Sequence, residues 1–167
     1  ADGLHVFAAF LFTHNSQISI GAYALGFAFG LPSLMLIFYQ GIPLGGMLVV
    51  FHKAGLLYDF VGWLSIHGTT ELFAAIISGA AGLRVGIAFA FPGPRSRLVA
   101  ASEAGKDSGS AMLGVIIMLM IAGMLEGFAR QLIQSTSLRY TVGGAMLVMW
   151  LCYFYLPRRA TSGAAAS

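Results

Sequence analysis

Ionisable and amide side chains lie inside otherwise apolar stretches of this 167-residue chain. An ionisable group in a bilayer costs about 2.5–3.5 kcal/mol on insertion scales, so it needs a partner or a wet cavity. His67 and Glu71 are four residues apart, which places them on one helix face. We predict one intramembrane polar cluster, formed by His14, His67, Glu71 and Glu126 and supported by Asn15, Gln40 and Arg130.

Three kinds of chemistry suit this predicted cluster. It could be an internal hydrogen-bonded network that fixes the helices, a binding site for a metal, proton or small solute, or a catalytic centre with a metal-activated water and a glutamate base. Two imidazoles and two carboxylates suit zinc or a similar divalent ion, but the spacing His-x-x-x-Glu supplies no third fixed ligand. Glu126 and Arg130 are also four apart and could pair with each other.

No known catalytic motif accompanies these residues. The sequence contains neither His-Glu-x-x-His, typical of zinc proteases, nor Gly-x-Ser-x-Gly, typical of serine hydrolases. It also contains no glycine-rich loop of the kind that holds phosphate groups. We therefore assign no catalytic residue and favour a protein without enzymatic activity.

Composition indicates that lipid surrounds the chain. Hydrophobic residues make up 58% and charged residues only 9%, with a mean hydropathy of +0.84. Soluble domains carry about a quarter charged residues, and a fold of this size has too much surface to cover with so few. The formal charge of +3 comes from Lys and Arg residues between and after apolar runs, which is typical of orientation signals and not of a nucleic-acid interface.

The apolar runs predict an all-α, polytopic bundle of transmembrane helices. About 20 residues are needed to cross roughly 30 Å of hydrocarbon. Residues 1–157 form the predicted transmembrane domain, and residues 158–167 a disordered cytoplasmic tail. Residues 95–108 are the long hydrophilic segment. We expect about five spanning helices, at 4–30, 32–51, 68–91, 109–133 and 138–156, and a short re-entrant or interfacial helix at 58–66.

Basic residues predict which side each connection occupies. Arg84, Arg95 and Lys106 lie near the third connection, and Arg158 follows the last span, so both clusters fall on the cytoplasmic side. This topology places Glu71 and Glu126 at a similar depth in the outer part of the membrane. It also puts the N-terminus outside, from which we expect an upstream spanning helix.

Small residues recur every four positions and predict close helix packing. Such ridges let helix backbones approach each other in lipid, either within one chain or in a homo-oligomer. The ridges are Ala22, Gly26 and Gly30; Gly41 and Gly45; Gly82, Gly86 and Ala90; and Gly123 and Gly127.

One stretch of sequence resembles a known family. The run Ile-His-Gly-Thr-Thr-Glu-Leu at 66–72, followed by Gly-Ala-Ala-Gly-Leu-Arg-Val-Gly at 79–86, is similar to the central signature of the stage II sporulation protein M family. Further elements occur in the family's order, although Gln40 stands where the family usually has Asn. They are His14-Asn15, Gly26 and Gly30, Gln40-Gly41, and Leu125-Glu126-Gly127-Phe128.

The resemblance implies a multi-pass helical protein of the bacterial cytoplasmic membrane. The family's namesake works in sporulation with two peptidoglycan-degrading partners, as a membrane scaffold. The leading hypothesis is therefore a non-enzymatic scaffold or assembly component linked to remodelling of the cell envelope, with lipid, envelope proteins and further copies of the chain as partners. The alternatives are an ion, proton or small-solute transporter or channel, and an intramembrane metal-dependent hydrolase.

Overall fold

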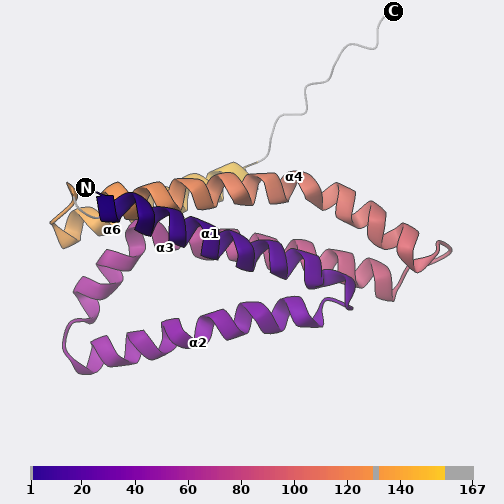
Figure 1. Ribbon diagram of the computed structural model, residues 1–167, viewed down its shortest axis with the longest axis horizontal. Coiled ribbons are helices and arrows are strands. Elements are labelled where there is room, and N and C mark those ends of the chain that lie inside the picture. The colour runs from indigo at the N-terminus through magenta and orange to yellow at the C-terminus, as the bar shows by residue number, and fades with distance from the viewer. Residues whose placement is uncertain (1, 130–131, 157–167) are drawn as a thin grey trace, which may run out of the picture.

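The computed structural model is all-helical, as the sequence predicts. It describes residues 2–129 and 132–156, and no strand occurs among them. The predicted tail at 158–167 lies outside the described residues. In chain order (Figure 1) the elements are α1 (Asp2–Ala24), the 3₁₀ turn η1 (Leu25–Phe27), α2 (Leu31–Lys53), α3 (Leu57–Ala90), α4 (Arg97–Met124), the π turn η2 (Leu125–Ala129) and α6 (Thr136–Tyr155).

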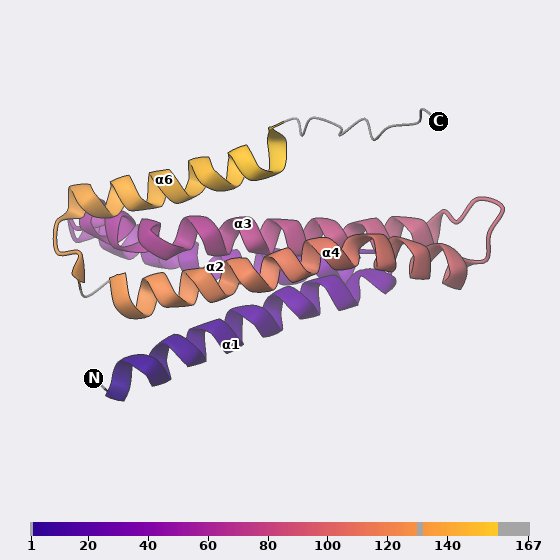
Figure 2. The same ribbon diagram turned by 90° about the horizontal axis from the view of Figure 1, so that it is seen from above.

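Helix α3 is the central element of the bundle. It contacts α1, α2, α4 and α6, and α4 runs alongside it for most of its length (Figure 2). In Figure 1, α2 begins beside α1 and α3, then diverges from α1, and its other end leads into the first turns of α3. Apolar side chains between α3, α4 and α6 form the core, namely Ala74, Ala81, Met112, Val115, Met118, Leu119 and Trp150.

The predicted short helix at 58–66 is not a separate element. It forms the first turns of α3, which runs unbroken for 34 residues and is about 51 Å long. Polar residues at the predicted boundary bond to backbone carbonyls: Ser65 Oγ donates to Gly62 O at 2.9 Å, and Thr69 Oγ1 donates to Ser65 O at 3.2 Å. Because these hydroxyls are satisfied locally, the helix continues through them.

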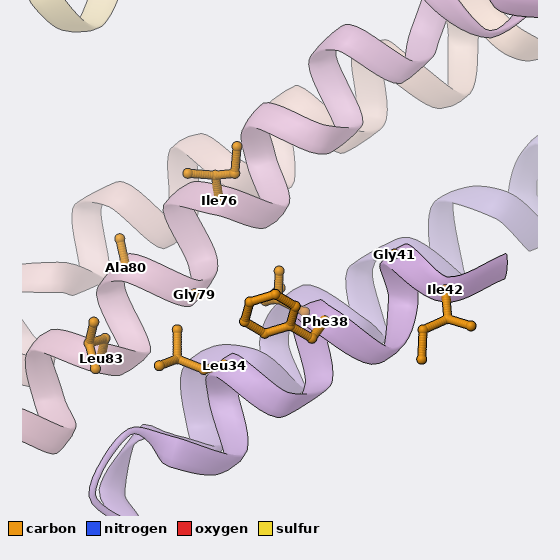
Figure 3. A pocket seen from close by; sticks show the side chains of 9 residues that line it. Leu34, Phe38, Gly41, Ile42, Ile76, Gly79, Ala80 and Leu83 are labelled. Carbon is orange, nitrogen blue, oxygen red and sulfur yellow. The ribbon is translucent and has the colours of Figure 1, made fainter. Parts of the chain in front are cut away.

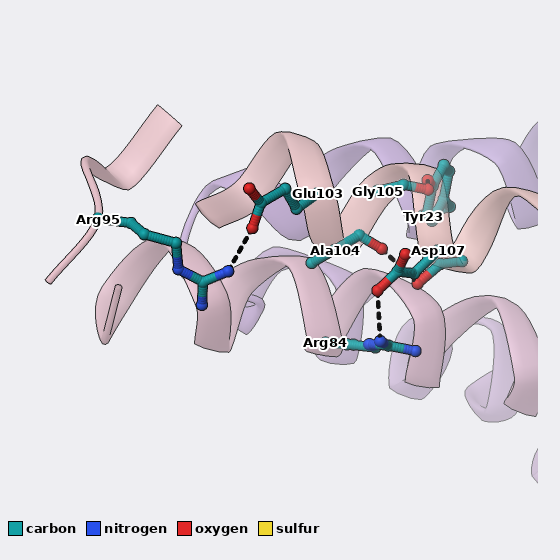
Figure 4. A network of polar contacts seen from close by, with 8 residues as sticks. Tyr23, Arg84, Arg95, Glu103, Ala104, Gly105 and Asp107 are labelled. Atoms are coloured by element: carbon teal, nitrogen blue, oxygen red, sulfur yellow. Dashed lines mark hydrogen bonds and ion pairs between the residues drawn. The ribbon is translucent and has the colours of Figure 1, made fainter. Parts of the chain in front are cut away.

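The hydrophilic segment at 95–108 is also mostly helical. Helix α4 begins at Arg97, and the Oγ of Ser96 caps it by accepting a hydrogen bond from the backbone N–H of Val99 at 3.3 Å. Two exposed ion pairs hold this segment, Arg84 with Asp107 at 2.9 Å and Arg95 with Glu103 (Figure 4). Most charges of this segment, namely Arg97, Glu103, Lys106 and Asp107, therefore lie on the first turns of α4.

Three helices are long and apolar enough to cross a membrane by length and composition. They are α2, α3 and the continuous stretch Arg97–Ala129 formed by α4 and η2. Within the described residues, α1 and α6 are not among them, so the predicted number of about five spans is not confirmed. The bounds of α6 agree closely with the predicted helix at 138–156.

Two of the predicted small-residue ridges pack against each other within the chain. A Cβ added to Gly26 would collide with the backbone of Gly82, and one added to Gly86 would collide with the backbone of Gly30. Gly30 adopts a left-handed conformation, with φ of 75°, immediately before α2. The turn between α1 and α2 can therefore lie directly on α3 only because these positions lack side chains.

We predict that Gly86→Ala destabilises the protein by about 1–3 kcal/mol, because the added methyl group forces apart two backbones in contact. Gly114→Ala is the matched control, since a Cβ there meets nothing within 4 Å and alanine favours the helix by up to about 1 kcal/mol. The free energy of unfolding in mixed detergent micelles checks both. Equal stabilities for the two variants would contradict the glycine contact.

Candidate functional site

Glu126 lies in an unusual turn of helix. Residues Leu125–Ala129 form a π turn at the end of α4, where the Glu126 side chain is only 3% exposed. A π turn is wider than an α turn and redirects the side chains that it carries, and such turns are frequent at functional sites. The turn directs Glu126 and Gly127 into the interior of the bundle.

Glu126 meets His67 of α3. The distance from His67 Nε2 to Glu126 Oε2 is 3.6 Å, and His67 is 4% exposed. This separation is within range for an ion pair but beyond that of a normal hydrogen bond. The edge of the Trp63 ring packs against the imidazole, with ring centroids 5.4 Å apart. The pairing therefore links α3 to η2 in a buried, apolar setting.

A second polar contact joins α1 to the same part of α3. Asn15 Nδ2 donates a hydrogen bond to Glu71 Oε1 at 2.8 Å. The Glu71 carboxyl group also lies within electrostatic range of the Glu126 carboxyl group. Three separate elements thus contribute to one polar cluster, which consists of Asn15, His67, Glu71 and Glu126.

This cluster borders a cavity of about 390 Å³ between α1, α2 and α3. Asn15, Gln40 and Glu71 line it together with apolar residues that include Ile37 and Leu119. Gln40 therefore faces the same space as Asn15 and Glu71, although it comes from a different helix. A carboxylate accepts hydrogen bonds, and each amide both donates and accepts them, so the cavity wall can bind a polar group.

One sequence-predicted member, His14, stands apart from the cluster. His14 is exposed, and its ring stacks on Phe10 with centroids 5.9 Å apart. Consecutive residues of an α-helix differ by about 100° in direction, and here Asn15 faces Glu71 while His14 points away from it. Arg130 lies outside the described residues, and its predicted pairing with Glu126 stays a prediction.

Sequence reasoning missed Trp150, which contacts a buried residue close to the cluster. Trp150 Nε1 of α6 donates a hydrogen bond to Thr70 Oγ1 at 3.0 Å, and Thr70 is fully buried. The sequence places Thr70 near the face of His67, three residues earlier, but nothing in it pairs Thr70 with Trp150. No signal in the sequence indicates the π turn either.

The described side chains show no group of three or more His, Cys, Asp or Glu residues placed to bind a metal ion. Zinc binding by His14, His67, Glu71 and Glu126 therefore gains no support from the geometry and stays a prediction. The arrangement instead does two things chemically. It pairs ionisable groups with one another, and it presents a carboxyl group and two amides to a cavity.

We predict that His67→Ala lowers the free energy of unfolding by about 3 kcal/mol or more, because removing one partner leaves the other charge buried without it. His14→Ala is the matched control and should change this free energy by no more than about 0.5 kcal/mol, since the ring is exposed. Unfolding titrations in mixed micelles measure both. Similar losses from the two variants would mean that the cluster does not hold the fold together.

The family model for stage II sporulation protein M matches residues 2–129, which include every described residue of the cluster and well over half of the chain. No curated protein and no solved structure matches the chain. The match confirms the resemblance that the 66–86 stretch indicated. The chain belongs to the stage II sporulation protein M family.

Proposed function

We propose that this protein is a non-enzymatic, multi-pass scaffold of the bacterial cytoplasmic membrane, and that it positions proteins that remodel the cell envelope. The observation that carries the proposal is the inward pairing of the polar groups. His67 pairs with Glu126, and Asn15 bonds to Glu71, so that these contacts join α1, α3 and η2. Such contacts fix the three elements relative to one another, as a scaffold that positions other proteins requires. The chain is also a member of the stage II sporulation protein M family.

The length of α3 supports the same role. At about 51 Å it exceeds the roughly 30 Å of bilayer hydrocarbon, so its ends extend into the polar layers. Each end carries exposed polar contacts with a neighbouring element: Arg84 with Asp107 at one end, and Thr136 Oγ1 with Asp59 Oδ1 at 2.8 Å at the other. These rigid ends are surfaces on which partners on both sides could assemble.

The basic residues support the proposed orientation. Arg84, Arg95, Arg97 and Lys106 all lie near the connection between α3 and α4. Connections that carry Lys and Arg stay in the cytoplasm, so this end of the bundle is the cytoplasmic one under our proposal.

The two alternative functions have less support. A transporter or channel would use the cavity beside Glu71. The described residues, however, outline no path that leads from one side of the membrane to the other. A metal-dependent hydrolase needs a set of ligands that the described residues do not bring together. Both stay predictions.

We predict that the chain, tagged in its native bacterium and isolated after mild cross-linking, recovers peptidoglycan-cleaving proteins above the level seen with an unrelated multi-pass protein. His67→Ala should reduce this recovery, because it loosens the framework, whereas His14→Ala should leave it unchanged. Quantitative mass spectrometry of the isolated complexes measures the recovery, and immunoblotting confirms equal amounts of each variant in the membrane.

The scaffold proposal is wrong if no peptidoglycan-cleaving protein is enriched with the wild-type chain. It is also wrong if cells remodel their envelope normally with a variant that recovers none of these proteins.

A further inference from the structure

An apolar groove separates α2 from α3. Its volume is about 630 Å³, and apolar side chains of α2 face those of α3 across it (Figure 3). Gly41 and Gly79 contribute no side chains, which leaves the groove open between the helices. The lining side chains of α2 are Leu34, Ile37, Phe38 and Ile42, and those of α3 are Ile76, Ala80 and Leu83.

The groove adjoins the polar cavity beside Glu71. Ile37, Gly41 and Ile76 line both spaces, so the two are adjacent, and together they are called the compartment. One limb of this compartment is apolar and lies between α2 and α3. The other limb ends at the carboxyl group of Glu71 and the amide groups of Asn15 and Gln40.

The polar end lies at the level of membrane hydrocarbon. Both α2 and α3 are long and apolar enough to cross a membrane, and Glu71 is about 21 Å along α3 from Leu57 and about 28 Å from Ala90. Among the described residues, the Gln40 side chain makes no hydrogen bond. A polar group without a partner in hydrocarbon is costly, so this end of the compartment favours a ligand that bonds to it.

We propose that this compartment binds a single-chain amphiphile whose polar end donates hydrogen bonds. The apolar tail lies in the groove, and a hydroxyl or ammonium group reaches Glu71 and the side-chain carbonyl of Gln40. Glu71 accepts one hydrogen bond from Asn15, and a carboxylate has room for several more. This site is a further property of the protein and does not depend on the scaffold role.

The two limbs contribute differently to binding. Lipid tails are as apolar as leucine, so moving a tail from the bilayer into the groove supplies no hydrophobic gain. The groove admits the tail and packs against it, whereas the polar end selects the ligand. Blocking the groove should therefore abolish all binding, and changing the polar end should abolish only the preference for a hydrogen-bond donor.

Gly41 offers a precise way to block the compartment. It lines both limbs, and a Cβ added there meets nothing within 4 Å. Gly41→Leu should therefore fill the space without disturbing the backbone. Gly45→Leu is the matched control, because Gly45 is on the same helix, has the same freedom from contacts and lines neither limb.

The experiment uses the full chain in phosphatidylcholine vesicles with three photoreactive probes of equal chain length. One probe ends in a primary amine, one in a hydroxyl group and one in a methyl ester that cannot donate. Labelling of α2 and α3, located by peptide mass spectrometry, is compared for wild type, Gly41→Leu, Gly45→Leu, Glu71→Gln and Gln40→Leu. Detergent melting curves confirm that each variant is folded.

We expect the amine or hydroxyl probe to label wild type and Gly45→Leu at least about threefold more than the methyl ester, the factor typical of one hydrogen bond between groups in a membrane. Which of the two probes labels more strongly identifies the ligand as an amine or an alcohol. Gly41→Leu should lose labelling of the groove residues by all three probes, whereas the exposed apolar residues elsewhere on α2 and α3 should be labelled as in wild type. Gln40→Leu removes an acceptor and should reduce the preference for either donor. Glu71→Gln keeps one acceptor oxygen but removes the charge, so it should reduce the preference for the amine most.

Two results would overturn the proposal. One is equal labelling of the groove residues of wild type by all three probes, and the other is labelling of these residues in Gly41→Leu as strong as in Gly45→Leu. Either result would mean that bulk lipid fills the groove without selection.

Discussion

The contact between His67 and Glu126 is the constraint on which the rest of the bundle depends. Both side chains are almost completely buried, and neither can be turned toward hydrocarbon without a large cost. Their pairing fixes η2 against the first third of α3 and so sets the position of α4 along it. The apolar core between α3, α4 and α6 then packs in the register that this pairing defines.

The glycines of α3 extend the constraint to α1. Because Gly82 and Gly86 let the turn at Gly26 and Gly30 lie on the α3 backbone, α1 runs close enough for Asn15 to reach Glu71. A side chain at these crossings would move α1 outward and break that hydrogen bond. Close backbone packing and polar pairing therefore support each other, although they lie several helical turns apart.

The sequence predicted the helical class and the shared face of His67 and Glu71, because hydropathy and the helical period report these directly. The family followed from the resemblance of the 66–86 stretch. It did not predict that α3 and α4 extend through polar stretches, since Ser65 and Ser96 serve a helix as well as a loop. Nor did it predict η2, whose widening follows from tertiary packing. The sequence also could not tell which of His14 and Asn15 faces Glu71; the structure places Asn15 there and leaves His14 exposed.

The most direct measurement of the central pairing is a double-mutant cycle on His67 and Glu126, with Ala at each position and in combination. The free energy of unfolding in mixed micelles is compared across the four proteins. Our account predicts that the double variant loses less stability than the sum of the single variants, by about 0.5–3 kcal/mol. Strictly additive losses would show that the two side chains do not interact and would contradict the account.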